Sequence, residues 1–253
     1  MARYEIKRKG EKEFTQYTSP SEILGQLEKG FHFYNWIAEL CVKENDKTAW
    51  TKKRDATADI GLEFHGLVET YINIKIKEQM PDMRMLLKDY NVNIKQMFYQ
   101  FLLFEKNNVK KFLESEKPVV HEELCCAGTA DFVFLDKENK ICLCDLKTKN
   151  GIYGKEPAMQ VTFYASARTT MSGDYEVKFK QDGQSWVKTF SYEPMFIHYT
   201  AILCIYRDFF NMDFIPVKEK DAPYLLQGFL RLLDYFYIIS ARKLNNKRAK
   251  KRQ

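Results

Sequence analysis

The sequence predicts an α/β protein with a central mixed sheet flanked by helices. Apolar residues recur at helical spacing through residues 19–116. From residue 117 the pattern changes to an alternation of apolar and polar residues, which is typical of strands. Further helical patterns follow at 156–171 and 222–244. Because helical segments lie before, between and after the strands, we expect helices on both faces of the sheet.

The helical region begins with a polar segment rich in serine, "TSPSEI". Ser19 or Ser21 is the expected N-cap of a helix that starts at about Ser21. A second helix is predicted from near Asp59, and Pro81 limits its extent. Residues 83–116 are predicted to form one or two further helices.

Three strands are predicted next, at 117–126, 129–135 and 140–148. A helix follows at 156–171, with Pro157 in its first turn. Residues 175–180 and 185–192 are expected to form a hairpin around Asp182-Gly183. A strand at 200–207 and a helix at 222–244 complete the expected order.

Length and charge suggest how the 253-residue chain is organised. We expect one domain at 19–240, with a helical part at 19–117 and a sheet-containing part at 118–240. Residues 1–18 are polar and are expected to be flexible. The net charge is +6, and residues 241–253 contain seven cations and no acid. Subtracting these seven leaves −1 for residues 1–240, so the basicity lies mainly in a tail suited to phosphate backbones or to solvent.

The six cysteines form no C-x-x-C pair, which argues against a structural zinc site. The charged start "MARYEIKRKGEKEF" lacks the apolar core of a secretion signal. No apolar stretch reaches the roughly 18 residues that a membrane span needs. We therefore expect a reduced, intracellular protein without a membrane partner, cytoplasmic and compatible with a phage or organellar origin.

Two carboxylates and an amine stand in the segment "GTADFVFLDKENKICLCDLKTK", where packing does not explain them. Asp145 and Lys147 are two apart on a strand and share a face. If Leu135 pairs with Ile141, Asp131 lies opposite Asp145, with Cβ atoms roughly 5 Å apart. Carboxylates this close suit Mg²⁺ or Mn²⁺. An ion pair at a sheet edge is the alternative interpretation of so short a pattern.

Two further pairs of polar residues are spaced four apart on predicted helices. His65 and Glu69 share one helix face, and imidazole is a common ligand of transition metals. Gln160 and Tyr164 share a face of the helix that follows Lys147. Either pair alone would be ordinary surface or core residues.

Together these motifs resemble the PD-(D/E)xK nuclease superfamily, and within it the RecB-like exonuclease branch. The branch has a helix G-x-x-x-H-x-x-x-E, a G-x-x-D strand, a (D/E)-x-K-T strand and a helix Q-x-x-x-Y. The chain matches them in order with Gly61–His65–Glu69, Gly128–Asp131, Asp145–Lys147–Thr148 and Gln160–Tyr164. The resemblance covers about residues 19–165 and implies a restriction-endonuclease-like core with an N-terminal helical region.

The resemblance also implies roles. Asp131 and Asp145 would bind the metal with the Leu146 carbonyl and His65, and Lys147 would be the catalytic lysine. Gln160 and Tyr164 would support the site or contact DNA, and Glu69 would belong to it in a less defined role. Iron–sulfur members carry three cysteines downstream, whereas only Cys204 follows the Q-x-x-x-Y helix. We therefore expect a cluster-free relative, of the phage exonuclease or mitochondrial genome maintenance exonuclease type.

The expected function is metal-dependent hydrolysis of DNA, exonucleolytic on single strands or ends. The alternatives are a structure-specific endonuclease of the same fold and a non-catalytic nucleic-acid-binding protein. A third is a replication-complex or phage structural protein in which the D-x-K pattern is accidental. The expected partners are DNA and replication or recombination proteins, and the basic tail is expected to add non-specific DNA affinity. Trp36 and Trp50 could stack bases, although core packing explains them as well.

Overall fold

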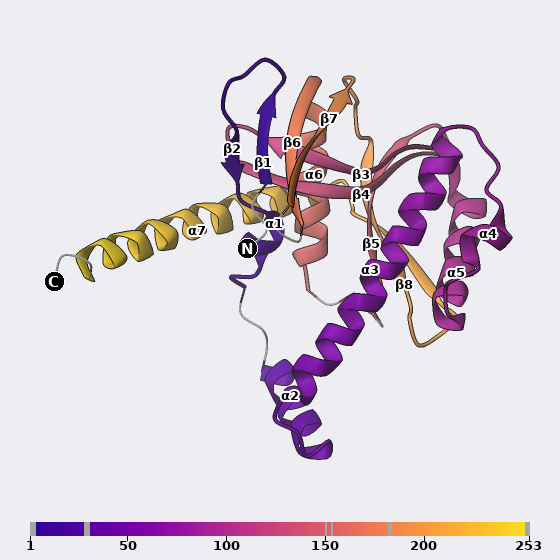
Figure 1. Ribbon diagram of the computed structural model, residues 1–253, viewed down its shortest axis with the longest axis horizontal. Helices are drawn as coiled ribbons and strands as arrows, with labels where there is room; N and C mark the ends of the chain where they lie inside the picture. Colours follow the sequence, from indigo (N-terminus) through magenta and orange to yellow (C-terminus); the bar gives the residue numbers. More distant parts are fainter. Residues whose placement is uncertain (1–3, 28–30, 150, 153, 182–183, 251–253) are drawn as a thin grey trace.

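The structure is a computed structural model that describes residues 4–27, 31–149, 151–152, 154–181 and 184–250, with side chains except at 31–32, 180–181 and 241–250. Its centre is a mixed sheet in the order β3-β4-β5-β8-β9 (Figure 1). The strands are β3 (Val109–His121), β4 (Cys126–Asp136), β5 (Ile141–Lys147), β8 (Tyr199–Ile205) and β9 (Met212–Pro216). β5 and β8 run parallel and the other neighbours antiparallel.

Helices cover both faces of this sheet, as the sequence predicts. They are α1 (Pro20–Leu24), α2 (Phe31–Lys43), α3 (Ala49–Ile76), α4 (Met83–Leu87), α5 (Val92–Asn108), α6 (Glu156–Thr170) and α7 (Ala222–Lys250). One face packs phenylalanines of β4 against α5, where Phe101 lies 6.0 Å from Phe132 between ring centroids. On the other face, Val133 and Leu143 of the sheet share a core with Phe163 of α6. The two cores exclude water from both sides of the central strands.

The pairing of β4 with β5 confirms the predicted register. Leu135 lies opposite Ile141, and Phe132 lies opposite Cys144. One residue further along, Asp131 and Asp145 therefore stand on neighbouring strands on the same side of the sheet.

The prediction of a flexible N-terminus is wrong from Tyr4 onward. A second sheet, in the order β2-β1-β6-β7, contains β1 (Tyr4–Arg8), β2 (Thr15–Tyr17), β6 (Gly173–Gln181) and β7 (Gln184–Tyr192). Ile6 of β1 is 1% exposed, whereas Lys7 forms an ion pair with Glu176 of β6 at 3.1 Å. The segment is polar because its charges have partners on a strand that is distant in sequence. The predicted 175–192 hairpin is confirmed in its strand pairing, while Asp182-Gly183 lies outside the described residues.

Two helix boundaries also differ from the prediction. Ser19 is the N-cap of α1, as expected, since its hydroxyl accepts from the Glu22 N–H at 3.2 Å. The second predicted helix starts ten residues earlier, at Ala49. Residues 109–116, predicted as helix, belong to β3. Two register shifts in the β3–β4 ladder interrupt the alternation of apolar and polar residues there. This part of the strand therefore does not show the two-residue period by which strands are predicted.

α3 is 28 residues long, about 42 Å at 1.5 Å per residue. Apart from Ala49, its buried residues all lie in the second half, from Phe64 onward. Figure 1 shows α2 and the start of α3 projecting from the body as an arm. Trp36 and Trp50 pack edge to face within the arm, with ring centroids 5.2 Å apart, which favours the packing interpretation of these tryptophans.

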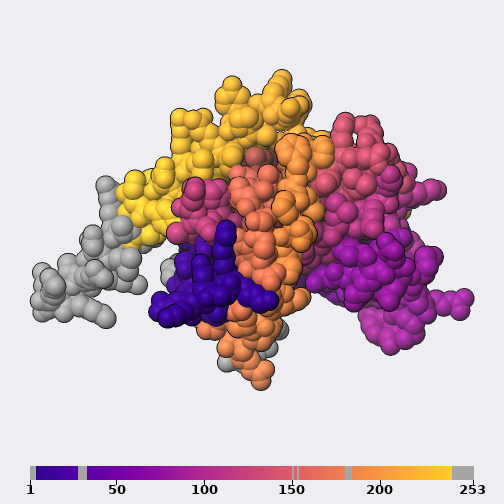
Figure 2. Space-filling model, turned by 90° about the horizontal axis from the view of Figure 1, so that it is seen from above, coloured from indigo at the N-terminus to yellow at the C-terminus, as the bar shows by residue number. Residues whose placement is uncertain are grey.

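α7 extends along the side of the molecule opposite α3–α5 (Figure 2). Its helical backbone continues to Lys250, so most of the predicted tail prolongs this helix. The basic side chains of the tail lie outside the described residues, and their role stays a prediction. No helix in the described ranges is both long and apolar enough to cross a membrane.

Candidate active site

α3 crosses the carboxyl ends of β5 and β8 and continues to β3 and β4. Three of its residues, each four apart, meet successive strands. Arg207, just after β8, donates to the Thr57 hydroxyl at 2.8 Å. A Cβ at Gly61 would lie 3.1 Å from the hydroxyl oxygen of Thr148, just after β5. His65 lies beside Asp131 of β4, so the spacing of the G-x-x-x-H motif matches the way the helix crosses the sheet.

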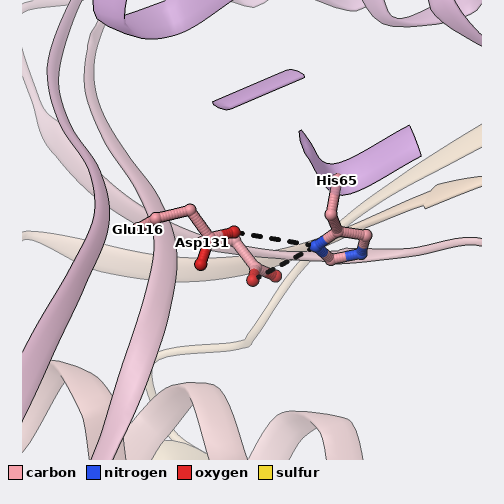
Figure 3. Close-up of side chains that lie close together, drawn as sticks. All are labelled: His65, Glu116 and Asp131. Atoms are coloured by element: carbon pink, nitrogen blue, oxygen red, sulfur yellow. Dashed lines mark ion pairs between the residues drawn. The ribbon is translucent and has the colours of Figure 1, made fainter. Parts of the chain in front are cut away.

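His65, Glu116 and Asp131 bring three ligand atoms within 4.8 Å of one another. The Nδ1 of His65 lies 3.5 Å from Oδ1 of Asp131 and 3.8 Å from Oε1 of Glu116. Both carboxylates point toward the imidazole (Figure 3). One nitrogen and two carboxylate oxygens are a donor set that suits Mn²⁺ or Mg²⁺.

The sequence analysis did not identify Glu116. It stands in β3 between Ser115, which pairs with Phe132, and Lys117, which pairs with Ala130, and so faces Asp131 across the ladder. Its φ is +46°, a conformation that costs a non-glycine residue roughly 1–2 kcal/mol. Such strain persists where the surroundings impose it. The sequence indicates Glu116 only as an acidic residue in a segment whose pattern predicts a helix.

The charges of these three groups depend on one another. Burial alone would lower the pKa of His65, but hydrogen bonds and charges from Asp131 and Glu116 outweigh it and raise that pKa to about 10. Burial would raise the pKa of Asp131, yet His65, Lys147 and the Leu146 N–H lower it overall. The pKa of Glu116 is raised, mainly by burial and partly by the charges of Asp131 and Glu69, while His65 opposes the rise. Without a metal, the imidazolium of His65 and the ammonium of Lys147 balance these carboxylates.

Asp145 and Lys147 lie next to this group and share a face, as predicted. Lys147 Nζ is 2.7 Å from Oδ2 of Asp145, which is almost fully buried. Among the described residues, Oδ2 has this ion pair but no further hydrogen-bond donor. Burial, together with the charge of Asp131, raises the pKa of Asp145 to about 6 against the opposing effect of Lys147. An incompletely satisfied buried carboxylate beside three ligand groups fits a site that takes a cation.

The predicted metal set differs from this group in two members. Asp145 is not among the three groups that share ligand distances, although Asp131 Oδ2 accepts the Leu146 N–H one residue further along. Ligation by Asp145 and by the Leu146 carbonyl stays a prediction. Glu69 is close enough for its charge to affect the pKa of Glu116 but is also outside the three.

Gln160 and Tyr164 of α6 also border the site. Gln160 Nε2 donates to the Tyr164 hydroxyl at 2.8 Å. The charges of Asp145 and Asp131 add to burial in raising the pKa of Tyr164 well above its ordinary value, so the phenol lies close to both carboxylates. The Q-x-x-x-Y pair therefore forms one unit that borders the acidic groups.

Tyr4 is a second neighbour that the sequence analysis missed. Its hydroxyl is 3.1 Å from the Thr129 hydroxyl, in the strand that carries Asp131. Burial raises its pKa, and the charges of Glu116 and Asp131 contribute to the rise. Tyr4 reaches the site because β1 pairs with β6, and no local pattern near residue 4 indicates that pairing.

Steric crowding explains why the G-x-x-D motif has glycine at position 128, and this explanation can be tested. A Cβ at Gly128 would lie 2.5 Å from a ring carbon of Tyr164, a side chain only 4% exposed. We expect Gly128→Ala to destabilise the protein by ~1–3 kcal/mol through overpacking. Gly66→Ala is the matched control, because a Cβ there meets open space and gains up to ~1 kcal/mol of helix propensity. Urea unfolding of both variants measures the difference, and equal stabilities would contradict the steric explanation.

The raised pKa of His65 predicts how the stability of the protein depends on pH once a chelator has removed any metal. A folded-state pKa of about 10 against an ordinary 6.5 means that the stabilisation is complete below pH 6.5 and is lost as pH rises toward 10. We expect the melting temperature to fall across this window and His65→Asn to remove most of that fall. Asp145 loses its own contribution in a lower window, between pH 3.8 and about 6. A His65→Asn profile that parallels the wild type above pH 7 would contradict the assignment.

The chain has no match among protein-family models, and no curated protein matches its sequence. A functional assignment therefore depends on the site itself. The predicted site side chains all lie in one region, where contacts or close charges connect them. They are His65, Glu69, Asp131, Asp145, Lys147, Gln160 and Tyr164. Glu116 and Tyr4 belong to the same region.

Proposed function

We propose that the protein is a Mg²⁺- or Mn²⁺-dependent deoxyribonuclease of the PD-(D/E)xK type, acting as an exonuclease on single-stranded DNA or DNA ends. The observation that carries the proposal is the convergence of His65, Glu116 and Asp131 beside the Asp145–Lys147 pair. These residues come from four separate elements of the chain. An accidental D-x-K pattern gives no reason for the histidine and a strained glutamate to meet at the same point.

The first step of the proposed chemistry is metal binding. His65, Glu116 and Asp131 would hold the cation, with Asp145 adjoining them. A bound divalent cation lowers the pKa of a water molecule and neutralises a phosphate. His65 must release its proton to become a ligand, because only the neutral imidazole coordinates. Metal binding is therefore expected to release a proton at neutral pH.

The second step is hydrolysis of the phosphodiester bond. Lys147 extends from the end of β5, and its amine is oriented by Asp145 at 2.7 Å. There it can orient the attacking water or stabilise the charge that develops on the phosphate. The Gln160–Tyr164 pair borders the acidic groups and can contact a phosphate or sugar oxygen. The roles of Lys147 and of the Gln160–Tyr164 pair suit a substrate with a phosphodiester backbone.

The decisive experiment is cleavage of labelled DNA by the purified protein. Single-stranded, linear duplex and circular DNA are incubated with Mg²⁺, Mn²⁺ or EDTA. We expect metal-dependent release of short products from single-stranded and linear DNA, and no product in EDTA. Cleavage of circular DNA would favour the structure-specific endonuclease. Binding of DNA without cleavage under every metal condition would favour the non-catalytic alternative and contradict the proposal.

A further inference from the structure

The loop between β8 and β9 presents two adjacent phenylalanine side chains to solvent. Phe209 and Phe210 are each 64% exposed, whereas Phe101 and Phe104 of the nearby α5 are completely buried. Two exposed aromatic rings next to each other are an unfavourable surface for a protein in water unless they have a partner.

The loop is held in place by the body of the protein. Gln100 of α5, itself 2% exposed, donates to the carbonyl oxygens of Tyr206 at 3.2 Å and Phe209 at 3.4 Å. Within the loop, the Asn211 N–H donates to the Phe209 carbonyl at 2.8 Å. Arg207 connects the loop to Thr57 of α3. These bonds hold the backbone that carries the two exposed rings, which lowers the entropy cost of ordering the loop on binding.

The loop lies at the same edge of the sheet as the catalytic lysine. β5 and β8 are parallel, and Lys147 stands opposite Cys204. Phe209 follows five residues later, within at most ~18 Å of Cys204 along the chain. Lys149 lies on the way, since its carbonyl accepts from the Cys204 thiol at 3.3 Å. A nucleic-acid strand that leaves Lys147 in this direction would pass the exposed Lys149 and reach the phenylalanines after a few nucleotides.

We propose that Phe209 and Phe210 form a stacking platform for unpaired bases of the strand that is bound at Lys147. The inference rests on the proposed function and specifies its substrate as single-stranded nucleic acid. Every base has a π face, so aromatic rings bind bases without sequence preference. Lys149 places positive charge along the same path, where the phosphates of the strand would run. Arg207 is paired with Asp208 at 2.9 Å and serves to anchor the loop. Paired bases in a duplex would present no free face to the rings.

The test is binding of fluorescein-labelled single-stranded oligonucleotides, measured by anisotropy in EDTA so that no hydrolysis takes place. One oligonucleotide has normal bases, and the other has abasic residues with the same number of phosphates. For the Phe209→Ala/Phe210→Ala variant we expect affinity for the normal oligonucleotide to fall about tenfold or more. Affinity for the abasic oligonucleotide is expected to stay unchanged.

Phe196→Ala is the matched control. Phe196 is 68% exposed and precedes β8, so it lies at the opposite end of the same strand. This variant is expected to bind both oligonucleotides like the wild type, and thermal unfolding checks that all variants are folded.

Three results would overturn the platform: an unchanged affinity of the double variant, an equal loss with abasic DNA, or a wild-type protein that does not bind single strands. The last result would assign the exposed rings to another kind of partner. These outcomes are separate from those of the cleavage assay. Wild-type cleavage with unchanged binding by the double variant removes only the platform, whereas base-dependent binding without cleavage removes only the nuclease.

Discussion

Replacing Lys147 with alanine should lower DNA cleavage by ~10²-fold or more while the protein still binds metal and DNA. That loss is the scale expected when one acid–base or electrostatic group is removed from a reaction. Lys147 is proposed to act on the water or the phosphate, and its ammonium group has no lone pair with which to bind a cation. Calorimetric titration with Mn²⁺ and cleavage assays on the same preparation measure both properties.

The ion pair with Asp145 calls for a second variant. Without Lys147 the buried Asp145 has lost the cation at 2.7 Å, and breaking a buried pair can cost ~3–5 kcal/mol. Lys147→Arg keeps a positive charge near Asp145 but changes the shape and position of the donor. We expect this variant to melt near the wild-type temperature and still cleave poorly. Wild-type cleavage by Lys147→Ala would mean that the pair is only an ion pair at a sheet edge.

Asp145→Asn is expected to lose metal affinity as well as cleavage activity, unlike Lys147→Ala. If Asp145 adjoins the metal as proposed, its loss should weaken metal binding as well as lower the rate. High Mn²⁺ should then recover part of the activity, because Mn²⁺ binds mixed nitrogen and oxygen ligands more tightly than Mg²⁺ does. Recovery by Mn²⁺ for Asp145→Asn but not for Lys147→Ala would separate a metal-binding role from a catalytic one.

Replacing Asp131 with asparagine should lower cleavage by ~10²–10³-fold and abolish tight Mn²⁺ binding. Asp131 is the residue that contacts both His65 and the β5 backbone, through Oδ1 and Oδ2 respectively. Asparagine has nearly the same shape and can still accept the Leu146 N–H, but it provides no charge. A metal contributes several kcal/mol to such reactions, at about 1.4 kcal/mol per tenfold change in rate.

The control for Asp131 is Glu138→Gln, which removes an exposed acid paired with Lys140 in the β4–β5 turn. This control should bind metal and cleave DNA like the wild type. Glu116 is the candidate ligand that was identified from the structure and not from the sequence. We expect Glu116→Gln to weaken Mn²⁺ binding too. Retention of metal affinity by both Asp131→Asn and Glu116→Gln would contradict the proposed site.

The features that local patterns determine were predictable. Leu135 and Ile141 flank a short polar turn between two apolar strands, so their pairing could be predicted once the length of the loop was assumed. The shared face of Asp145 and Lys147 followed from the period of a strand. Gln160 and Tyr164 are one helical turn apart, and their hydrogen bond is the contact that this spacing allows.

The features that depend on distant pairing were not predictable. Glu116 reaches the site in a strand whose alternation is interrupted by two register shifts. Tyr4 reaches it from a polar segment whose ion-pairing partners lie in β6. In both cases the energy that fixes the residue comes from contacts that no short window of sequence contains.

The pairing of β1 with β6 has a consequence for how the chain matures during synthesis. Glu5 of β1 pairs with Lys178 of β6, so the partner strand is translated about 170 residues later. β2, the other partner of β1, is made within a few residues, but at ~5–20 residues per second β6 follows roughly 9–35 seconds later. Tyr4 can join the site only after that delay, and closing so long a loop adds an entropy cost to the step. Nascent chains arrested before β6 should therefore expose the N-terminal segment to protease, although the residues proposed to hold the metal have already been made.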